Sequence, residues 1–260
     1  MTKALYSSDL TDAQWEMLNP LLPAPAKRGR PLTSHRQVID GIFYNLRTGC
    51  QWRLLPKEFG PWETIYGRFR KWKKDGVWSA LNDCLRARVR AAVGKRCRPT
   101  AAILDSQSVR SADHAGNTGY DAGKKIKGRK RHLLVDTLGL VLGIAVTPAS
   151  TPERTGAKAL LVRVLCWFTW LRMLWVDGGY SGPEFALWVR TQRPKLVVEV
   201  VARLSQTKGF KILRRRWVVE RTFGWLMKQR RLVRDYEVTD SSAEAWVYIA
   251  MIRIMLRRLA

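Results

Sequence analysis

Three acidic residues occupy positions from which carboxylates could act together on one substrate. Asp105 ends a short apolar run, and Asp177 ends another, directly before two glycines. Glu220 lies in residues 216–226, a stretch with helical periodicity. Ligands of open α/β sheets bind at the carboxyl ends of the strands. We therefore expect the two aspartates to converge there and the helix to bring Glu220 to the same edge.

The chemistry available to such a trio is metal-dependent. Three carboxylates around one point repel each other and raise each other's pKa unless cations neutralise them. Mg²⁺ prefers carboxylate oxygens, keeps some of its waters and shares phosphate oxygens with its substrate. Two such ions about 4 Å apart, with Mn²⁺ as a possible substitute, activate a nucleophile and stabilise the leaving oxygen of a phosphodiester. Taken singly, each aspartate could instead be a strand-end cap, and Glu220 an ion-paired helix residue.

The composition points to a polyanionic partner. The 260 residues include 47 Lys and Arg against 21 acidic residues, a formal charge of +26, which is typical of nucleic-acid-binding proteins. Twelve Trp exclude a disordered chain, and four Cys without a CxxC pair exclude a disulfide scaffold and make a zinc site unexpected. The start of the chain has no apolar signal region, and Arg163 and Arg172 interrupt its most membrane-like stretch. We therefore expect a cytoplasmic protein.

The first hundred residues have the periodicity of helices. Residues 11–14 form a capping-box pattern before the first of them. The basic, Gly-containing segment 94–99 breaks the pattern, and we place a domain boundary there. Residues 1–98 are then a small all-α, helix-turn-helix-like DNA-binding domain, and residues 99–260 are a catalytic domain. Further helices are expected over residues 34–46, 61–74 and 78–93.

Beyond residue 99 strands and helices alternate. Apolar runs predict a strand ending at Asp105, a hairpin over residues 132–146 with a turn at Gly139, and two later strands. Helical patterns separate these strands, and two more helices fill residues 214–260. The order predicts a mixed α/β sheet with flanking helices. Strands are expected at 101–105, 132–136, 140–146, 173–177 and 196–201, and helices at 156–170 and 183–193.

Several stretches resemble the bacterial insertion-sequence DDE transposases of the "insertion sequence five" family. The second domain resembles their catalytic domain, and residues 9–15 and 49–56 resemble their N-terminal helical region, so the similarity covers nearly the whole chain. The stretches of the catalytic domain are Leu104-Asp105-Ser106-Gln107-Ser108-Val109, residues 119–132, Val135-Asp136-Thr137-Leu138-Gly139-Leu140, Trp175-Val176-Asp177-Gly178-Gly179-Tyr180 and residues 217–226.

The resemblance implies an RNase H-like fold in which Asp105, Asp177 and Glu220 bind the metal ions. It implies a transposase that hydrolyses phosphodiesters at terminal inverted repeats and then joins the freed 3′-hydroxyl to target DNA. Such a protein would act in the bacterial cytoplasm, near the nucleoid, as a homodimer or larger synaptic assembly. A DNA-binding regulator, an inactive remnant that binds ends without cutting, and an RNase H-fold nuclease without strand transfer remain alternatives.

Around Glu220 the chain matches only part of the family's Tyr, Arg, Glu, Lys signature. Arg216 stands four positions before Glu220, as the signature requires, while Leu213 and Met227 replace the Tyr and the Lys. Lys228 comes one residue late, and Arg230 and Arg231 follow. These basic residues are candidates for contacts to the terminal phosphate, or are simply solvated.

Other basic residues are candidates for DNA contacts that set affinity without reading sequence. The run 124–131 adjoins the proposed site, residues 62–74 could be a recognition helix, and the basic segment 27–31 could enter a minor groove. Solvated charge runs are the alternative in each case. The candidates are Lys124, Lys125, Lys127, Arg129, Lys130, Arg131, Arg68, Lys71, Lys74, Arg28 and Arg30.

Overall fold

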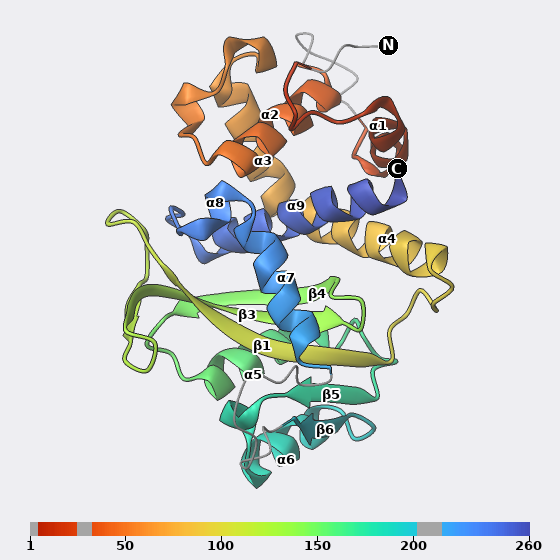
Figure 1. The fold of residues 1–260 in the computed structure, drawn as a ribbon, viewed down its shortest axis with the longest axis vertical. Coiled ribbons are helices and arrows are strands. Elements are labelled where there is room, and N and C mark those ends of the chain that lie inside the picture. Colours follow the sequence, from red (N-terminus) through yellow and green to blue (C-terminus); the bar gives the residue numbers. More distant parts are fainter. Residues whose placement is uncertain (1–4, 25–32, 202–214) are drawn as a thin grey trace. The chain divides into compact units, whose positions relative to one another are not determined.

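The computed structural model describes residues 5–24, 33–201 and 215–260 (Figure 1). The chain forms two compact units. The first comprises residues 1–95, 226–234 and 241–260, and the second residues 96–225 and 235–240. The sequence divides the chain once, at residues 98 and 99, whereas the first unit also contains C-terminal residues.

The first unit is helical. The predicted capping box is present at Thr11, whose hydroxyl accepts from the Gln14 N–H while the Gln14 side chain accepts from the Thr11 N–H. Phe69 and Trp246 stack in its core with 5.0 Å between ring centroids. Its helices are α1 (Asp12–Leu18), α2 (His35–Thr48), α3 (Trp62–Lys74), α4 (Val77–Ala92), α8 (Arg230–Val233) and α9 (Asp240–Leu259). The first residue of α9, Asp240, belongs to the second unit.

A mixed sheet forms the centre of the second unit, as the strand pattern predicts. Its strands run in the order β2-β3-β1-β5-β6, and β4 pairs with β3. β1 pairs antiparallel with β3 and parallel with β5. The strands are β1 (Ala101–Arg110), β2 (Gly119–Asp121), β3 (Ile126–Asp136), β4 (Val141–Pro148), β5 (Met173–Val176) and β6 (Val197–Val200).

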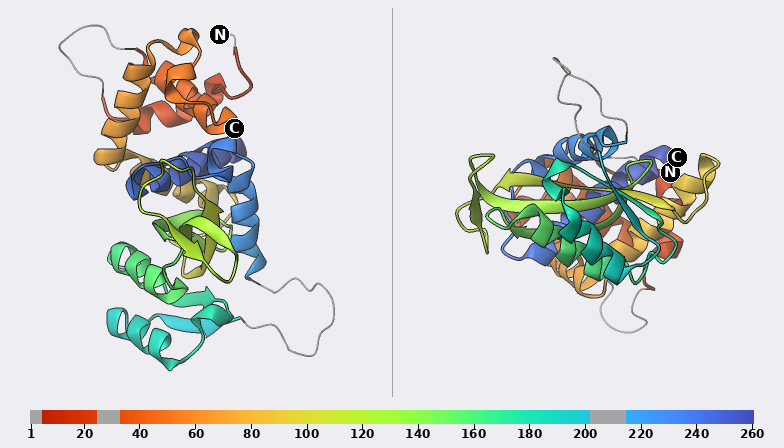
Figure 2. Two further views of the ribbon diagram at one scale, coloured as in Figure 1. Left: turned by 90° about the vertical axis from the view of Figure 1, so that its left-hand side faces the viewer. Right: turned by 90° about the horizontal axis from the view of Figure 1, so that it is seen from below.

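Helices cover both faces of this sheet (Figure 2). One face carries α5 (Glu153–Val164) and α6 (Pro183–Gln192), and alternate β1 and β5 residues such as Leu104 and Val176 pack beneath them. The other face carries α7 (Trp217–Met227). Since successive strand residues point to opposite faces, Asp105 points towards α7 and Ser106 towards α5.

Helix α7 is fixed to the turn between β3 and β4. The Thr222 hydroxyl donates to the Gly139 carbonyl at 2.9 Å, and the Arg221 guanidinium donates to the Leu138 carbonyl at 3.0 Å. Gly139 has a φ of 82°, and a β-carbon there would lie 2.6 Å from Thr222 Oγ1. Glycine is therefore needed both for the turn and for the close approach of α7. In the described part of the chain, no helix has the length and apolar character to cross a membrane.

Candidate active site

Asp105 and Asp177 lie level with each other on two neighbouring strands, Asp105 within β1 and Asp177 directly after β5. Ile103 of β1 is in parallel register with Trp175 of β5, and each aspartate follows two residues later. This register brings together acids that are far apart in the sequence. The two apolar runs correctly predict the two strands, but the expectation that Asp105 ends its strand is wrong, because pairing with β3 continues β1 to Arg110.

Glu220 is linked to Asp177 by an arginine that lies between the two carboxylates. Arg216 Nη2 lies 3.7 Å from Asp177 Oδ2 and 3.5 Å from Glu220 Oε1. Within the described ranges, no three Asp, Glu, His or Cys side chains are close enough to hold a metal ion. The Arg216 guanidinium lies within ion-pair distance of two of the three acids and supplies a counter-charge to carboxylates that would otherwise repel each other.

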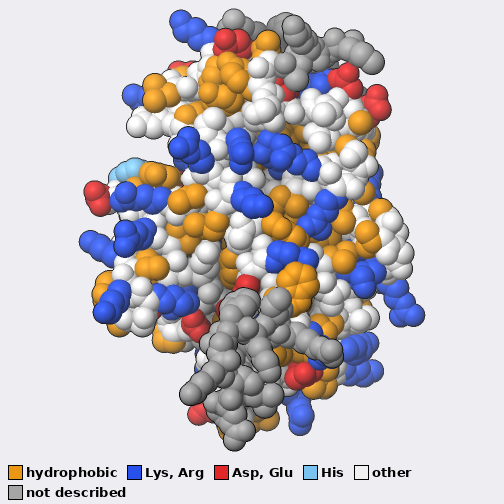
Figure 3. All heavy atoms as spheres, in the orientation of Figure 1, with side chains coloured by type: hydrophobic (Ala, Val, Ile, Leu, Met, Phe, Trp, Pro, Cys, Tyr) orange, Lys and Arg blue, Asp and Glu red, His pale blue; other side chains and the backbone are white. Residues whose placement is uncertain are grey.

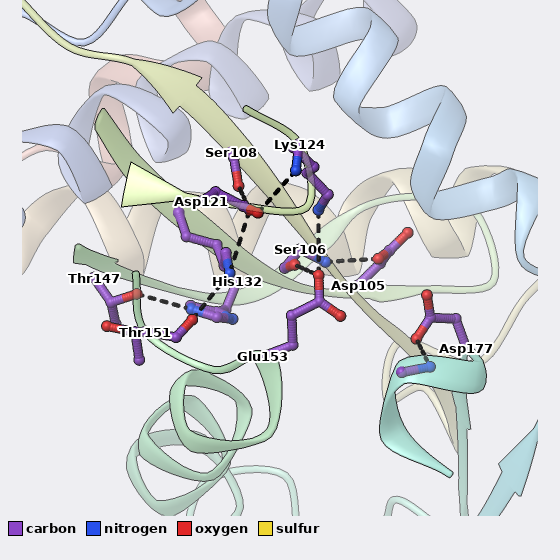
Figure 4. A network of polar contacts seen from close by, with 12 residues as sticks. Asp105, Ser106, Ser108, Asp121, Lys124, His132, Thr147, Thr151, Glu153 and Asp177 are labelled. Carbon is purple, nitrogen blue, oxygen red and sulfur yellow. Dashed lines mark hydrogen bonds and ion pairs between the residues drawn. The ribbon is translucent and has the colours of Figure 1, made fainter. Parts of the chain in front are cut away.

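The pKa of Asp105 is shifted by burial and by several neighbouring charges. Burial, chiefly, raises the pKa of Asp105 to about 6, and the nearby Asp177 and Glu153 carboxylates raise it further. The Ser106 N–H, 2.7 Å from Asp105 Oδ1, and the Arg216 guanidinium oppose this rise. Figure 4 shows the Asp105 side chain between those of Asp177 and Glu153.

Glu153 is a fourth acid at this site that the sequence reasoning missed. It is the first residue of α5, where its position predicts only an ordinary acid in the first turn of a helix. The Ser106 hydroxyl donates to Glu153 Oε1 at 2.8 Å, and Lys124 Nζ lies 3.2 Å from the same oxygen. In Figure 4 the Glu153, Asp105 and Asp177 carboxylates border one space. No spacing in the sequence signals this neighbourhood, because β1, α5 and β5 meet only in the fold.

The donor set fits a hard divalent cation. Carboxylate oxygens are the ligands that Mg²⁺ prefers, and Asp105, Asp177 and Glu153 supply only such oxygens. Tyr180 is 1% exposed, and its buried hydroxyl has no hydrogen-bond partner of normal geometry. Burial, and then the Asp105, Glu153 and Asp177 charges, raise the pKa of Tyr180. The phenol therefore stays protonated beside these carboxylates.

The basic run beside the site divides into an exposed and a buried part. Lys124, Lys125 and Lys127 are exposed. Figure 3 shows Lys and Arg side chains spread over the face that it draws, with few acidic side chains among them. Arg129, Lys130 and Arg131 are buried, because β3 begins at Ile126 rather than at residue 132 and carries them into the sheet.

The buried part of the run has internal partners. Arg129 Nη1 lies 3.3 Å from Asp240, and Lys130 Nζ lies 3.4 Å from Asp121. Arg131 is 1% exposed. These three side chains are buried inside the fold, which corrects their assignment to a DNA-binding surface. His132 is buried as well and contacts the Thr147 hydroxyl at 3.0 Å, as an ordinary polar core residue does.

The remaining candidates for DNA contacts differ in exposure. Lys228, Arg230 and Lys74 are exposed, and Lys71 is exposed but pairs with Asp75 at 2.9 Å. Arg68 is half-buried, with its guanidinium over the Trp72 ring. Arg231 is buried and donates to the Cys50 carbonyl at 3.1 Å, so its assignment to DNA is also corrected. Arg28 and Arg30 lie outside the described residues.

Two family models match the chain. Residues 96–255 match the model described as "Transposase DDE domain", and residues 10–82 match "Putative transposase of IS4/5 family". The first match spans the sheet, α5, α6 and α7, and so includes all three acids predicted from the sequence.

Two curated proteins are similar to part of the chain. "Insertion element IS402 uncharacterized 16.2 kDa protein" of Burkholderia cepacia is 38% identical over 109 residues, which are 39% of this chain and 73% of that protein. "Uncharacterized protein y4sN" of Sinorhizobium fredii is 30% identical over 107 residues, which are 41% of this chain and 79% of that protein.

Proposed function

The chain belongs to the DDE transposase family of insertion elements, and from this premise we propose that it cuts DNA at the ends of its element and joins those ends to target DNA. The family implies an RNase H-like fold, DNA binding and nucleic-acid processing assisted by divalent metal ions. Mg²⁺ as the ion, hydrolysis followed by strand transfer, and the residues responsible are the parts that we propose.

The observation that carries the proposal is the register of β1 and β5. It sets Asp105, within β1, level with Asp177, directly after the adjacent parallel strand β5, on the sheet that α7 covers with Glu220. In the proposal these three residues bind the metal ions. Two Mg²⁺ ions bound there would activate the attacking oxygen and stabilise the leaving one.

Other residues of the chain bind and orient the DNA. The exposed Lys124, Lys125 and Lys127 next to the site would hold phosphates, which fixes the position of the duplex without reading its sequence. Arg216 lies within 4 Å of two of the acids, so it could turn to a phosphate once cations replace its charge there. Two element ends must be held together for joining, and we propose a homodimer or larger assembly for that step.

A cleavage experiment tests this function. The purified chain is incubated with duplexes that carry the inverted repeats flanking its gene, with Mg²⁺ or with EDTA. We expect nicks or breaks at the repeat ends only with Mg²⁺, and joined products when target DNA is added. Cleavage without joining would identify a nuclease instead, and binding without cleavage would identify a regulator or an inactive remnant.

A further inference from the structure

We infer that Glu153 is a fourth carboxylate of the divalent-metal site, an inference that rests on the proposed function. Its position explains why. Glu153 begins α5 on the side of the sheet opposite α7, and its carboxylate accepts a hydrogen bond from Ser106, in the middle of β1 beside Asp105. The site thus receives acids from both sides of the sheet, with Glu220 on α7 and Glu153 on α5.

The space beside Gly179 shows that Glu153 and Asp177 face the same point. A β-carbon on Gly179 would lie 2.7 Å from Glu153 Oε2 and 3.1 Å from Asp177 Oδ1. Any other residue there would press against both carboxylates, so the glycine keeps this small space open. Glu153 Oε2 faces it, while Oε1 bonds to Ser106 and Lys124.

Tyr180 provides an independent sign that a ligand belongs here. Its buried hydroxyl lacks a hydrogen-bond partner of normal geometry, although buried polar groups are nearly always paired. The Asp105, Glu153 and Asp177 charges all act on this hydroxyl. Ser106 acts on it too, but the Ser106 hydroxyl donates its hydrogen to Glu153 and can only accept from the phenol, so the phenol oxygen has no donor. A hydrated cation among these carboxylates would offer the phenol the partner that it lacks.

Lys124 balances the charge of Glu153 in the structure. Its ammonium lies 3.2 Å from Glu153 Oε1, on the same acidic site where Arg216 pairs with Asp177. A cation that binds between the carboxylates must compete with this lysine. Mg²⁺ keeps several waters, so Glu153 can contribute directly or through a metal-bound water, and groups that act through such contacts change metal affinity by about 10- to 100-fold when they are mutated.

The test is a calorimetric titration of the full chain with Mn²⁺ in the absence of DNA. We expect Glu153→Gln to weaken Mn²⁺ binding by about 10-fold or more and Glu153→Asp to restore part of it. Glu184→Gln is the matched control, because Glu184 is an exposed acid in the first turn of α6. Ser106→Ala distinguishes a ligand from a structural support, since it removes the hydrogen bond but leaves the carboxylate. The inference is overturned if Glu153→Gln binds Mn²⁺ like the unchanged protein, or if Ser106→Ala weakens binding equally.

A second variant keeps the inference testable if Glu153→Gln does not fold. Lys124→Ala leaves the Glu153 carboxylate in place and removes its counter-charge, so it should bind Mn²⁺ severalfold more tightly. Unchanged or weaker binding would overturn the inference. Asp105→Asn separates this result from the proposed function. If Asp105→Asn and Glu153→Gln both bind Mn²⁺ normally, the proposed metal site is wrong. If Asp105→Asn loses binding and Glu153→Gln does not, only the role of Glu153 is wrong.

Discussion

Arg216 and Asp177 form an ion pair across the candidate active site, with 3.7 Å between Nη2 and Oδ2. The same guanidinium lies 3.5 Å from Glu220. One arginine therefore neutralises two of the acids that we propose as metal ligands. A divalent cation that binds Asp177 and Glu220 must therefore compete with Arg216 for their carboxylates.

Removing that arginine should strengthen metal binding in the absence of DNA. In Arg216→Ala, Asp177 and Glu220 lose their shared counter-charge, and an ion pair of this kind is worth about 1 kcal/mol. We expect calorimetry to show Mn²⁺ affinity rising by about fivefold. Arg190→Ala, at an exposed arginine of α6, is the control. Unchanged or lower affinity in Arg216→Ala would contradict the competition.

Neutralising any of the three proposed ligands should stop DNA cleavage but not DNA binding. For Asp105→Asn, Asp177→Asn and Glu220→Gln we expect the cleavage rate to fall by about 1,000-fold or more, because each change removes a negative ligand. Gel-shift affinity for the duplex should be equal or slightly higher, since the protein becomes more positive. Asp113→Asn, at an exposed acid of the same unit, should cut normally. A variant of the three that also cuts normally would remove its residue from the site.

DNA binding should weaken steeply as salt increases, in part because of the exposed lysines beside the site. Each phosphate contact contributes a slope of about −0.9 to log K against log salt concentration. Replacing Lys124, Lys125 and Lys127 by Gln should therefore make the slope shallower by about 2 to 3. Fluorescence anisotropy between low and moderate salt measures it. Lys195→Gln, at another exposed lysine, is the control, and an unchanged slope in the triple variant would exclude these lysines from the DNA path.

The hydrogen bond from Thr222 to Gly139 should matter for both stability and activity. Thr222→Val leaves the Gly139 carbonyl without this donor and should lower the free energy of unfolding by about 1 kcal/mol. Because α7 carries Glu220, the cleavage rate should fall too. Thr191→Val is the matched control, since the Thr191 hydroxyl bonds to Trp188 within its own helix. Urea unfolding and the cleavage assay together test this; equal effects of both substitutions would show that the contact does not position α7.

Asp40 should make the first unit less stable as pH rises. Burial, chiefly, raises its pKa to about 6, although the Leu10 N–H donates to it at 2.8 Å. A carboxyl with a raised pKa stabilises the fold fully below its unfolded pKa of about 4, and this contribution is lost as pH rises through about 6.

The substitution Asp40→Asn tests this pH dependence. It keeps an acceptor for Leu10 and removes the buried charge, so it should raise the free energy of unfolding by about 1–2 kcal/mol at pH 7 and by little at pH 4. Urea unfolding at several pH values gives the comparison, with Asp113→Asn as control. A constant difference between the variants across this range would show that Asp40 does not titrate as described.

The sequence predicts most elements correctly because their signals are local. The capping box at Thr11, the proline before α3 and the hairpin turn at Gly139 each depend on a few adjacent residues. Ends of elements are predicted less well. The expected strand at 132–136 begins at Ile126 in the structure, because pairing with β1 holds even a basic segment in the sheet.

By itself the sequence determined the apolar runs that end in Asp105 and Asp177, the helix that carries Glu220, and an excess of positive charge suited to DNA. Only the tertiary structure decided that Glu153 joins these acids, that Arg216 pairs with two of them, and that Arg129, Lys130 and Arg131 are internal. The reason is that strand order and register bring together residues with no fixed spacing along the chain. A charge is exposed or buried according to the neighbours that the fold supplies.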